Sequence, residues 1–203
     1  MKLLFATNNR YKLKEIQNII PAGIEIISLA DIGCMEDIPE TGNSIDANAS
    51  EKAFFVYNKY NIDCFADDTG LEIEALKGGP GVYSARYAGE GCCFEDNINK
   101  VLFEMRGVSN RKACFRTVIS LIIDGKEKQF EGRIDGLILS EKHGHEGFGY
   151  DPVFLPDGFD QTFAEMPPDL KNRISHRGLA VQKLVHYFES IDKYKKDILK
   201  PAI

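Results

Sequence analysis

The sequence predicts an α/β fold that begins with parallel strands and continues with an antiparallel hairpin. Residues 2–29 contain an apolar strand, an amphipathic helix and a second apolar strand, which is the order that produces parallel strands. Residues 114–123 are rich in β-branched side chains, and Asp124-Gly125 is a strong signal for a hairpin turn. The strand expected at residues 127–134 then returns antiparallel to its neighbour.

Helical spacing and chain breakers place the other elements. In the helix expected at residues 8–20, Leu13, Ile16 and Ile20 share one face, and Pro21 ends the helix. The remaining expected elements are strands at residues 2–6, 23–29, 64–66 and 71–76, helices at residues 44–60, 94–105 and 176–191, a loop at residues 78–81, and an irregular segment at residues 144–158. The 203 residues are 43% hydrophobic and 28% charged, as in an ordinary globular protein, and they can bury a sizeable core. Because no clear interdomain linker occurs, we expect residues 1–203 to form one domain with two lobes.

Net charge and cysteine content narrow the class of protein. The formal net charge is −6 and no long basic tract occurs, so any polyanionic ligand must be attracted by a few local cations or by a metal, and a general grip on nucleic acid is not expected. No apolar run approaches the roughly 20 residues that span a bilayer, and the apolar N-terminal stretch is too short for a signal peptide. Five cysteines without a CxxC pair are typical of reduced thiols in a cytoplasmic protein.

Polar residues from Thr7 to Lys12 directly follow the first expected strand. A helix that begins here directs free backbone N–H groups and the positive end of its dipole toward the end of that strand, which suits a phosphate. Asn9 and Lys12 are three residues apart and share a helix face. The segment lacks the GxxxxGK[ST] pattern of a P-loop. It is a candidate phosphate site; the alternative is a capped surface helix with a solvated lysine.

Asp67 and Asp68 directly follow the apolar strand expected at residues 64–66. Adjacent residues on an extended backbone point to opposite sides, so we expect one aspartate to face a cleft and the other to support a turn. A carboxylate at the end of a buried strand can bind a metal, orient a water or accept its proton. The alternative is a plain turn, because Asp, Thr and Gly all favour turns. Two charges immediately after so apolar a strand favour a functional role over a plain turn.

The segment from Gly147 to Pro152 could recognise a planar ligand. Glycines bracket Phe148, and Tyr150 precedes Asp151, so an aromatic ring could stack on a base while the backbone approaches closely. A packed irregular loop is the alternative.

The start of the last expected helix is a further candidate. Ser175 is a good N-cap, Arg177 offers a planar fork of donors, and Lys171 lies just upstream. The alternative is a capped helix that carries a surface arginine.

Taken in order, these segments resemble the inosine triphosphate pyrophosphatase family over nearly the whole chain. The matching motifs are Thr7-Asn8-Asn9 with Lys12, Glu40-Thr41-Gly42, Asn48-Ala49 with Lys52-Ala53, Ala66 to Leu71, Gly79 to Tyr87, Gly147 to Pro152, and Ser175 to Gly178. Each motif is weak alone, but their shared order and spacing leave little room for chance.

The resemblance implies a two-lobed fold in which helices flank a long curved mixed β-sheet and the active site lies in the cleft between the lobes. It implies hydrolysis of ITP, dITP and XTP to the monophosphate and pyrophosphate, which cleanses the nucleotide pool of deaminated purines. It also implies one essential Mg²⁺ per subunit, a homodimer, and a small nucleoside triphosphate as the partner, without nucleic acid or a membrane.

The resemblance also assigns roles to residues. Asp68 matches the catalytic proton acceptor and a metal ligand, and Asp67 or Glu40 is expected to assist it. Many members carry two glutamates near the Glu-Thr-Gly segment, but Pro39 stands at the outer position here, so Glu40 is the expected second metal ligand. The expected substrate-binding residues are Thr7, Asn8, Asn9, Arg10, Tyr11, Lys12, Lys52, Thr69, Phe148, Gly149, Tyr150, Asp151, Lys171, His176 and Arg177.

Base recognition is expected to depend on position 6 of the purine. Donors from His176 and Arg177 would match a carbonyl there and leave the amino group of adenine unmatched, while Phe148 stacks on the ring. One alternative is a Maf-type pyrophosphatase acting on modified pyrimidine triphosphates, against which the Ser-His-Arg and Gly-Phe-Gly-Tyr-Asp segments argue. Another is a nucleotide-binding regulator without catalysis, against which the paired aspartates argue.

Overall fold

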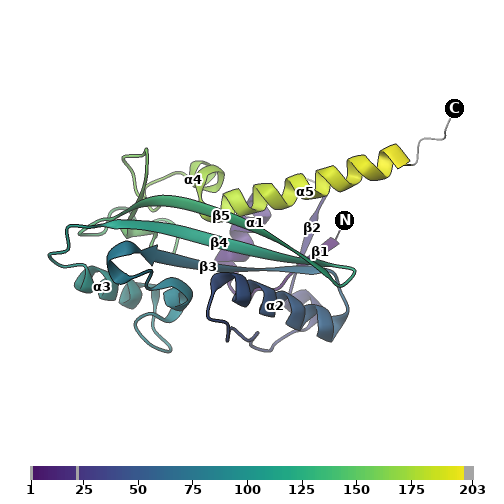
Figure 1. Cartoon of the computed structure of the whole chain (residues 1–203), viewed down its shortest axis with the longest axis horizontal. Helices are drawn as coiled ribbons and strands as arrows, with labels where there is room; N and C mark the ends of the chain where they lie inside the picture. The colour runs from purple at the N-terminus through teal and green to yellow at the C-terminus, as the bar shows by residue number, and fades with distance from the viewer. Residues whose placement is uncertain (1, 22, 199–203) are drawn as a thin grey trace.

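A six-stranded mixed sheet organises the molecule (Figure 1). The computed structural model of the chain describes residues 2–21 and 23–198, with side chains through residue 191. The strands lie in the order β2-β1-β3-β4-β5-β6. Their bounds are β1 Lys2–Phe5, β2 Glu25–Ser28, β3 Cys64–Ile73, β4 Lys112–Ile123, β5 Lys126–Ile138 and β6 Phe154–Pro156. β1 pairs in parallel with β2 and β3, and β3 to β6 pair antiparallel, so the mixed α/β sheet expected from the sequence is confirmed.

The first helix, α1 (Arg10–Ile19), connects the parallel strands β1 and β2. Asn9 caps it, because the Asn9 side-chain oxygen accepts hydrogen bonds from the backbone N–H groups of Tyr11 and Lys12. Ile16 is fully buried and packs with residues of β1 and β3, as the helical spacing predicted. The end of β1 and the start of α1 therefore lie directly beside β3.

β3 differs from the sequence prediction, because one strand of ten residues replaces two short strands joined by a turn. Asp67 and Asp68 pair with Ile119 and Val118 in the middle of the β3–β4 ladder. Gly70, which favoured the turn prediction, is present for a different reason. A Cβ there would lie 2.7 Å from the carbonyl oxygen of Gly81, so glycine permits another segment to cross close to the strand.

The hairpin predicted at Asp124-Gly125 is present between β4 and β5. Both turn residues have positive φ, 49° for Asp124 and 71° for Gly125, which matches the turn that suits twisted strands. Ile123 pairs with Lys126 across the turn. β4 and β5 are the longest strands and form a continuous ribbon along the molecule (Figure 1).

Helices cover both faces of the sheet. α2 (Ile45–Tyr60) packs on β3 and β4 from one face, and α5 (His176–Ile198) packs on β4 and β5 from the other (Figure 1). The first turn of α5 lies against β5 at Gly132, where a Cβ would be 1.9 Å from the carbonyl oxygen of His176. The other helical segments are η1 (Ala30–Ile32), η2 (Glu74–Leu76), η3 (Gly81–Arg86), α3 (Phe94–Glu104), η4 (Asp151–Val153) and α4 (Pro168–Ile174). No helix at residues 168–174 was expected from the sequence.

Buried apolar side chains form separate clusters toward the two ends of the long strands. One set surrounds β1, with Phe5 stacked on Phe65 at a centroid distance of 4.5 Å. Another packs α3, β6 and the far end of β3, and it includes Phe154 and Phe163. We call these regions the β1 half and the α3 half. Polar residues of β3, from Asp67 to Thr69, lie between them, and this is where the candidate site is located.

Candidate active site

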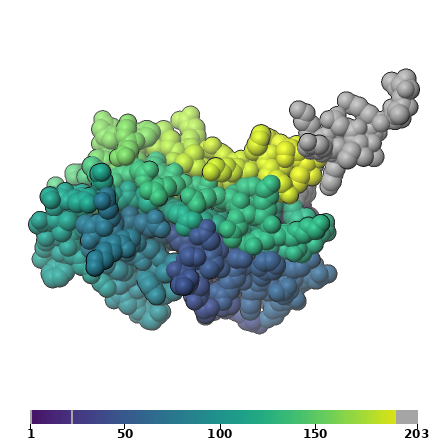
Figure 2. All heavy atoms as spheres, in the orientation of Figure 1, coloured from purple at the N-terminus to yellow at the C-terminus, as the bar shows by residue number. Residues whose placement is uncertain are grey.

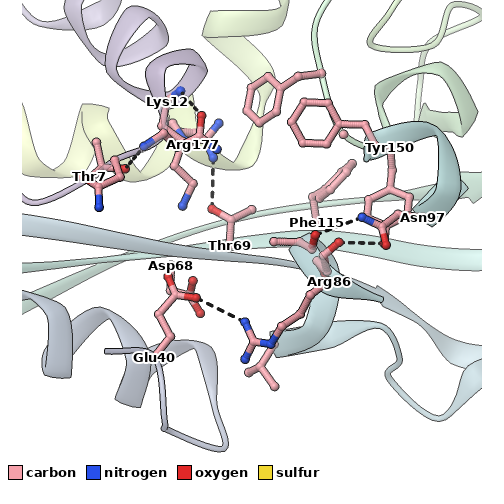
Figure 3. A pocket seen from close by; sticks show the side chains of 18 of the residues that line it. Thr7, Lys12, Glu40, Asp68, Thr69, Arg86, Asn97, Phe115, Tyr150 and Arg177 are labelled. Atoms are coloured by element: carbon pink, nitrogen blue, oxygen red, sulfur yellow. Dashed lines mark hydrogen bonds and ion pairs between the residues drawn. The ribbon is translucent and has the colours of Figure 1, made fainter. Parts of the chain in front are cut away.

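A cleft of about 660 Å³ opens where the β1 half meets the α3 half (Figure 3). Its volume falls within the range of small-molecule sites. Its lining contains most of the residues predicted from the sequence: Thr7, Asn8, Asn9, Lys12, Glu40, Lys52, Asp68, Thr69, Phe148, Gly149, Tyr150, Asp151, Lys171, His176 and Arg177. Three predicted residues, Arg10, Tyr11 and Asp67, do not line the cleft.

The cleft follows the edge of β3 that β1 leaves open. β1 pairs with β3 only through Leu4 and Phe5, whereas β3 continues beyond that point to Ile73. Alternate peptide groups of β3 face this edge: the Phe65 carbonyl accepts from Ala6 N–H at 2.8 Å, and Leu71 N–H donates to Ser84 Oγ at 2.9 Å. By the same alternation, the peptide group of Thr69 faces the cleft.

Asp68 lies on the α2 face of the sheet. Its Oδ1 accepts from Lys52 Nζ at 3.0 Å, and its Oδ2 accepts from Asn48 Nδ2 at 3.2 Å. Lys52 also donates to Glu40 at 2.6 Å. Burial alone would lower the pKa of Lys52, but the carboxylates of Asp68 and Glu40 outweigh burial and raise the pKa above its ordinary value. Two carboxylates thus meet at one ammonium group.

Asp67 lies on the opposite face of the same strand and is almost fully buried. Its carboxylate accepts from Lys12 at 3.0 Å and from the Arg177 Nε at 3.2 Å. Burial would raise the pKa of Asp67, but Lys12 and Arg177 overcome that effect and hold the pKa far below its usual range. The two aspartates therefore lie on opposite faces, as expected, but the role of Asp67 differs from the expected one. Asp67 anchors two cations and supports no turn.

The Asp67 face carries a chain of buried ion pairs. Glu15 of α1 accepts from Arg177 and, at 2.8 Å, from Lys171, and Lys171 donates to Asp151 at 2.6 Å. Burial raises the pKa of Asp151 above its ordinary value despite the neighbouring Lys171 ammonium. Arg177 is thus a buried network residue, which rules out the surface arginine of the alternative interpretation.

Lys12 is the cation with the least favourable surroundings. Burial lowers the pKa of Lys12 below its ordinary value despite the attraction of Asp67, and repulsion from Lys52 and Arg177 lowers the pKa further. Two backbone donors at the start of α1 are already bonded to Asn9, and Asn9 N–H donates to Thr7 Oγ1 at 3.1 Å. The expected free N–H groups of Tyr11 and Lys12 are therefore occupied by the cap. An anion near α1 would be attracted mainly by the Lys12 ammonium.

Aromatic rings gather at another part of the cleft. Phe148 stacks on Tyr11 with a centroid distance of 5.3 Å and lies 5.8 Å from the Phe94 ring. Lys171 Nζ and the Arg177 guanidinium carbon lie 5.2 and 5.5 Å from the Phe148 centroid. Tyr11, which does not line the cleft, contacts it through this ring.

His176 lies beside these rings as a buried neutral imidazole. It stacks on Phe115 with a centroid distance of 4.5 Å, and burial, reinforced by Arg177 and Lys171, lowers its pKa well below 6.5. Its Nδ1 is buried without a hydrogen-bond partner among the described residues. Ser175 caps α5 just before it, as predicted, by accepting from Gly178 N–H at 3.1 Å.

Several cleft residues were not singled out from the sequence. They are Ala6, Asp37, Ile38, Val82, Ser84, Ala85, Arg86, Glu90, Phe94, Asn97 and Phe115. Ser84, Ala85 and Arg86 belong to the Gly79–Tyr87 motif, which was quoted for the resemblance but was assigned no role. The ion pair of Arg86 with Glu40, at 3.5 Å, joins the two halves across the cleft (Figure 3).

The donor set near Asp68 fits a hard divalent cation. Among the described residues, no group of three or more His, Cys, Asp or Glu side chains could hold a metal ion. Mg²⁺ needs fewer protein ligands, because it commonly binds through one or two carboxylates and takes its other ligands from water and substrate phosphates. Asp68 and Glu40 could supply those two carboxylates, since both contact Lys52. Glu36 instead pairs with Lys59 at 2.5 Å.

Comparisons with known proteins agree with this architecture. Residues 3–187 match the model of the Ham1 family. The chain is 55% identical to a dITP/XTP pyrophosphatase of Flavobacterium johnsoniae, covering 91% of this chain and 96% of that protein. It is also 55% identical to a dITP/XTP pyrophosphatase of Porphyromonas gingivalis, covering 90% and 95%.

Solved structures show the same fold. The Staphylococcus aureus Ham1 protein superposes with a TM-score of 0.85 at 37% identity, covering 94% of this chain and 99% of that chain. A Coxiella burnetii HAM1 protein gives a TM-score of 0.86 at 35% identity with the same coverage. By sequence and by structure, this chain belongs to the Ham1 family.

Proposed function

We propose that this protein hydrolyses ITP, dITP and XTP to the nucleoside monophosphate and pyrophosphate. Relatives that share 55% of their residues with it are named dITP/XTP pyrophosphatases. The observation that carries the proposal is the placement of Asp68, whose carboxylate lies between Lys52 and Asn48 in the cleft. Cations at this position suit a triphosphate, and the aromatic rings near Phe148 suit a purine.

The proposed reaction forms one bond and breaks one bond. Asp68 accepts a proton from water while the water oxygen attacks the α-phosphorus. The bond from that phosphorus to the bridging oxygen breaks, and its electron pair remains on the departing pyrophosphate. Lys12 and Lys52 stabilise the negative charge that develops on the phosphate oxygens. Asp67 acts only by holding Lys12 and Arg177 in place, because it is buried behind them.

One Mg²⁺ per subunit completes the proposed site, with Asp68 and Glu40 as its protein ligands. When bound, the ion supplies positive charge that neutralises the phosphates. In the structure, both carboxylates are paired with Lys52. An ion bound to the two carboxylates would neutralise them and leave the Lys52 ammonium available to the substrate.

Base choice is assigned to the Asp67 face. Arg177 is held by Asp67 and Glu15, and His176 is a neutral ring in the cleft lining. Donors fixed in this way could pair with a carbonyl at position 6 of hypoxanthine or xanthine and would leave the amino group of adenine unmatched. Phe148 stacks on the base in this arrangement, which requires one of its present ring neighbours to move aside.

We expect residues 1–203 to act as one two-lobed domain and the protein to form a homodimer that needs no nucleic acid. A cytoplasmic location is supported by cysteines that are all free in the structure. None of the helices within residues 2–21 and 23–198 combines the length and apolar character that crossing a bilayer requires.

Pyrophosphate release from ITP, XTP, GTP and ATP tests the proposal. With Mg²⁺ present, we expect kcat/KM to be much higher for ITP and XTP than for ATP, and a chelator should abolish turnover. Equal values for ITP and ATP would contradict the assigned base recognition. Absence of pyrophosphate release from every purine triphosphate would contradict the function itself. Modified pyrimidine triphosphates as better substrates would instead favour the Maf-type alternative.

A further inference from the structure

Arg86 reaches the cleft from η3, a segment that contains none of the predicted site residues. It ends η3 in the α3 half, whereas Lys12 and Lys52 lie on α1 and α2 of the β1 half. Its guanidinium is 3.5 Å from Glu40 across the cleft. In the space-filling view, the dark-blue surface around residue 45 abuts the blue-teal surface of residues 75–90 below the long green strands (Figure 2). Arg86 therefore faces the Asp68 region from the opposite wall.

The backbone on both sides of Arg86 is held firmly. Ser84 Oγ donates to the Gly81 carbonyl at 2.6 Å, and the Ala85 carbonyl accepts from Asn97 Nδ2 at 3.1 Å. The Tyr87 carbonyl, just after Arg86, accepts from Lys100 Nζ at 2.7 Å. Such bonds fix the direction in which the Arg86 side chain leaves the chain, as an anion-binding residue requires.

The guanidinium itself is held much more loosely than the backbone. Its contacts with Glu40 and Glu90 are 3.5 and 3.9 Å long, whereas Lys52 contacts Glu40 at 2.6 Å. Glu90 is almost fully exposed, so it competes weakly for Arg86. Tyr83 supports the guanidinium with its ring, whose centroid is 5.4 Å away. Arg86 can therefore exchange Glu40 for a stronger anion without breaking a buried bidentate pair.

A chain of contacts leads from Asp68 across the cleft to Arg86. Asp68 contacts Lys52, Lys52 contacts Glu40, and Glu40 contacts Arg86. In Figure 3, Arg86 and Glu40 lie on the opposite side of Thr69 from Arg177, which contacts the aromatic end. If the α-phosphorus lies at Asp68 and the base at Phe148, the β- and γ-phosphates extend toward Arg86.

We infer that Arg86 binds the β- and γ-phosphates and stabilises pyrophosphate as the leaving group. This inference rests on the proposed function and names a further residue of the same site. As the bond between the α-phosphorus and the bridging oxygen breaks, the electron pair moves onto the pyrophosphate. Arg86 donates hydrogen bonds to those oxygens and transfers no proton, because a guanidinium keeps its charge. Its planar fork can contact two oxygens at once.

Binding of the separate products tests the inference. Titration calorimetry would measure inorganic pyrophosphate with Mg²⁺, and IMP, against the wild-type protein and Arg86→Gln. We expect the Kd of pyrophosphate to rise by about tenfold or more, because a charge-assisted bidentate contact is lost, while the Kd of IMP changes less than about twofold. The pyrophosphate Kd of Arg86→Lys should lie between those of the wild type and Arg86→Gln, since lysine keeps the charge and lacks the planar fork of donors.

Arg106→Gln is the matched control. Arg106 lies over Phe103 at 5.0 Å, as Arg86 lies over Tyr83, but it does not line the cleft. We expect this variant to bind both products as the wild type does. Thermal melting checks folding, and if Arg86→Gln does not fold, Arg86→Lys carries the comparison.

If Arg86→Gln weakened the binding of pyrophosphate and IMP equally, or left pyrophosphate binding unchanged, the role of Arg86 would be overturned. The measurement needs no turnover, so it is independent of the proposed reaction. A wild-type protein that hydrolyses ITP but binds pyrophosphate without help from Arg86 would contradict this inference alone. A protein that binds pyrophosphate through Arg86 yet releases none from ITP would contradict the proposed function alone.

Discussion

Asp67 and Asp68 are neighbours in the sequence but belong to two different polar networks. Asp67 faces α1 and α5, where its side chain has no exposed surface and contacts Lys12 and Arg177. Asp68 faces α2 and lines the cleft beside Lys52. The pleat of β3 causes this difference, because successive side chains of a strand point to opposite faces. One aspartate is part of the scaffold, and the other can touch a ligand.

This contrast shows why a pair of acidic residues in a motif need not share one role. On the Asp67 face, carboxylates and cations alternate through Glu15, Lys171 and Asp151, so the charges are balanced within the protein. On the Asp68 face, the contacts with Glu40 and Arg86 lie at the open cleft, where a metal and phosphates could replace them. The first network fixes geometry, and the second can exchange partners.

The largest expected effect comes from Asp68→Asn. The amide keeps the shape but cannot accept the proton of water, so we expect kcat for ITP to fall about 10³-fold, within the usual range for loss of a general base. Thermal melting should change little. Asp46→Asn, which alters an aspartate paired with Arg116 outside the cleft, is the control. Near wild-type turnover by Asp68→Asn would remove the distinction between the two aspartates.

Asp67→Asn should instead reduce stability. It leaves Lys12 without its buried counter-charge and removes one of the two carboxylates that pair with Arg177, and breaking a buried pair in this way costs about 3–5 kcal/mol. Urea unfolding would measure the loss. Asp135→Asn disrupts an exposed pair with Arg133 of 2.7 Å, so it should cost less than about 1 kcal/mol. Equal costs for the two variants would mean that Asp67 does not anchor its face.

The pH dependence of stability would sharpen the description of Asp67 further. Its folded pKa is depressed below the unfolded value, so its contribution is complete above the unfolded pKa and is lost as the pH falls through the acidic range. The Asp67→Asn variant should therefore show a smaller loss of stability on acidification than the wild type does. The same urea series repeated at several acidic pH values would measure this.

Glu40→Gln tests metal binding on the Asp68 face. Losing one of two carboxylate ligands should raise the Mg²⁺ concentration for half-maximal activity by about tenfold or more. Glu36→Gln is the control in the same loop, because Glu36 pairs with Lys59. An unchanged Mg²⁺ requirement in Glu40→Gln would exclude Glu40 as the second ligand.

His176 gives the Asp67 face a pH response near neutrality. The folded protein keeps His176 neutral, whereas the unfolded chain protonates it below pH of about 6.5. The free energy of unfolding should therefore fall by about 1.4 kcal/mol per pH unit as the pH decreases from about 6.5 toward 5. Measured by urea unfolding, the free energy of unfolding of His176→Gln should lack this dependence on pH, whereas a variant of the exposed His186 should keep it.

Phe148→Ala should have the smallest effect and should act on binding. Losing the stacked ring would raise the KM for ITP by about tenfold and leave kcat within about twofold, because the aromatic end is separate from Asp68. Phe159→Ala, a partly exposed ring outside the cleft, is the control. A fall in kcat with unchanged KM would show that the two faces do not divide binding and chemistry.

The spacing of apolar residues was sufficient to predict α1, α2, α3, α5 and the hairpin at Asp124-Gly125, because these depend on local pattern, but it did not predict α4. It failed at β3, where Asp67, Asp68 and Gly70 have turn-forming side chains but pair continuously with β4. There the long ladder with β4 outweighs local propensity. Gly70 is needed for the close approach of Gly81, a contact that no local pattern reveals.

The motifs identified most of the cleft, but they did not show which residues touch which. Glu15 and Arg177 are 162 positions apart and meet only because α1 and α5 lie on the same face. Likewise, Arg86 and Glu40 come from opposite halves. Arg10 was predicted because it lies within a motif, yet it does not line the cleft. Sequence order alone does not separate such residues.

Gly132 shows how far from the ligand a harmful substitution can lie. It does not line the cleft, and its backbone belongs to an ordinary strand of the sheet. A methyl group there would collide with the carbonyl of His176 and act as a wedge beneath α5, displacing His176 and Arg177 together. Tolerance to mutation in this protein therefore cannot be mapped by distance from the nucleotide. A Gly132→Ala substitution in β5 could abolish activity as effectively as a substitution in the cleft itself.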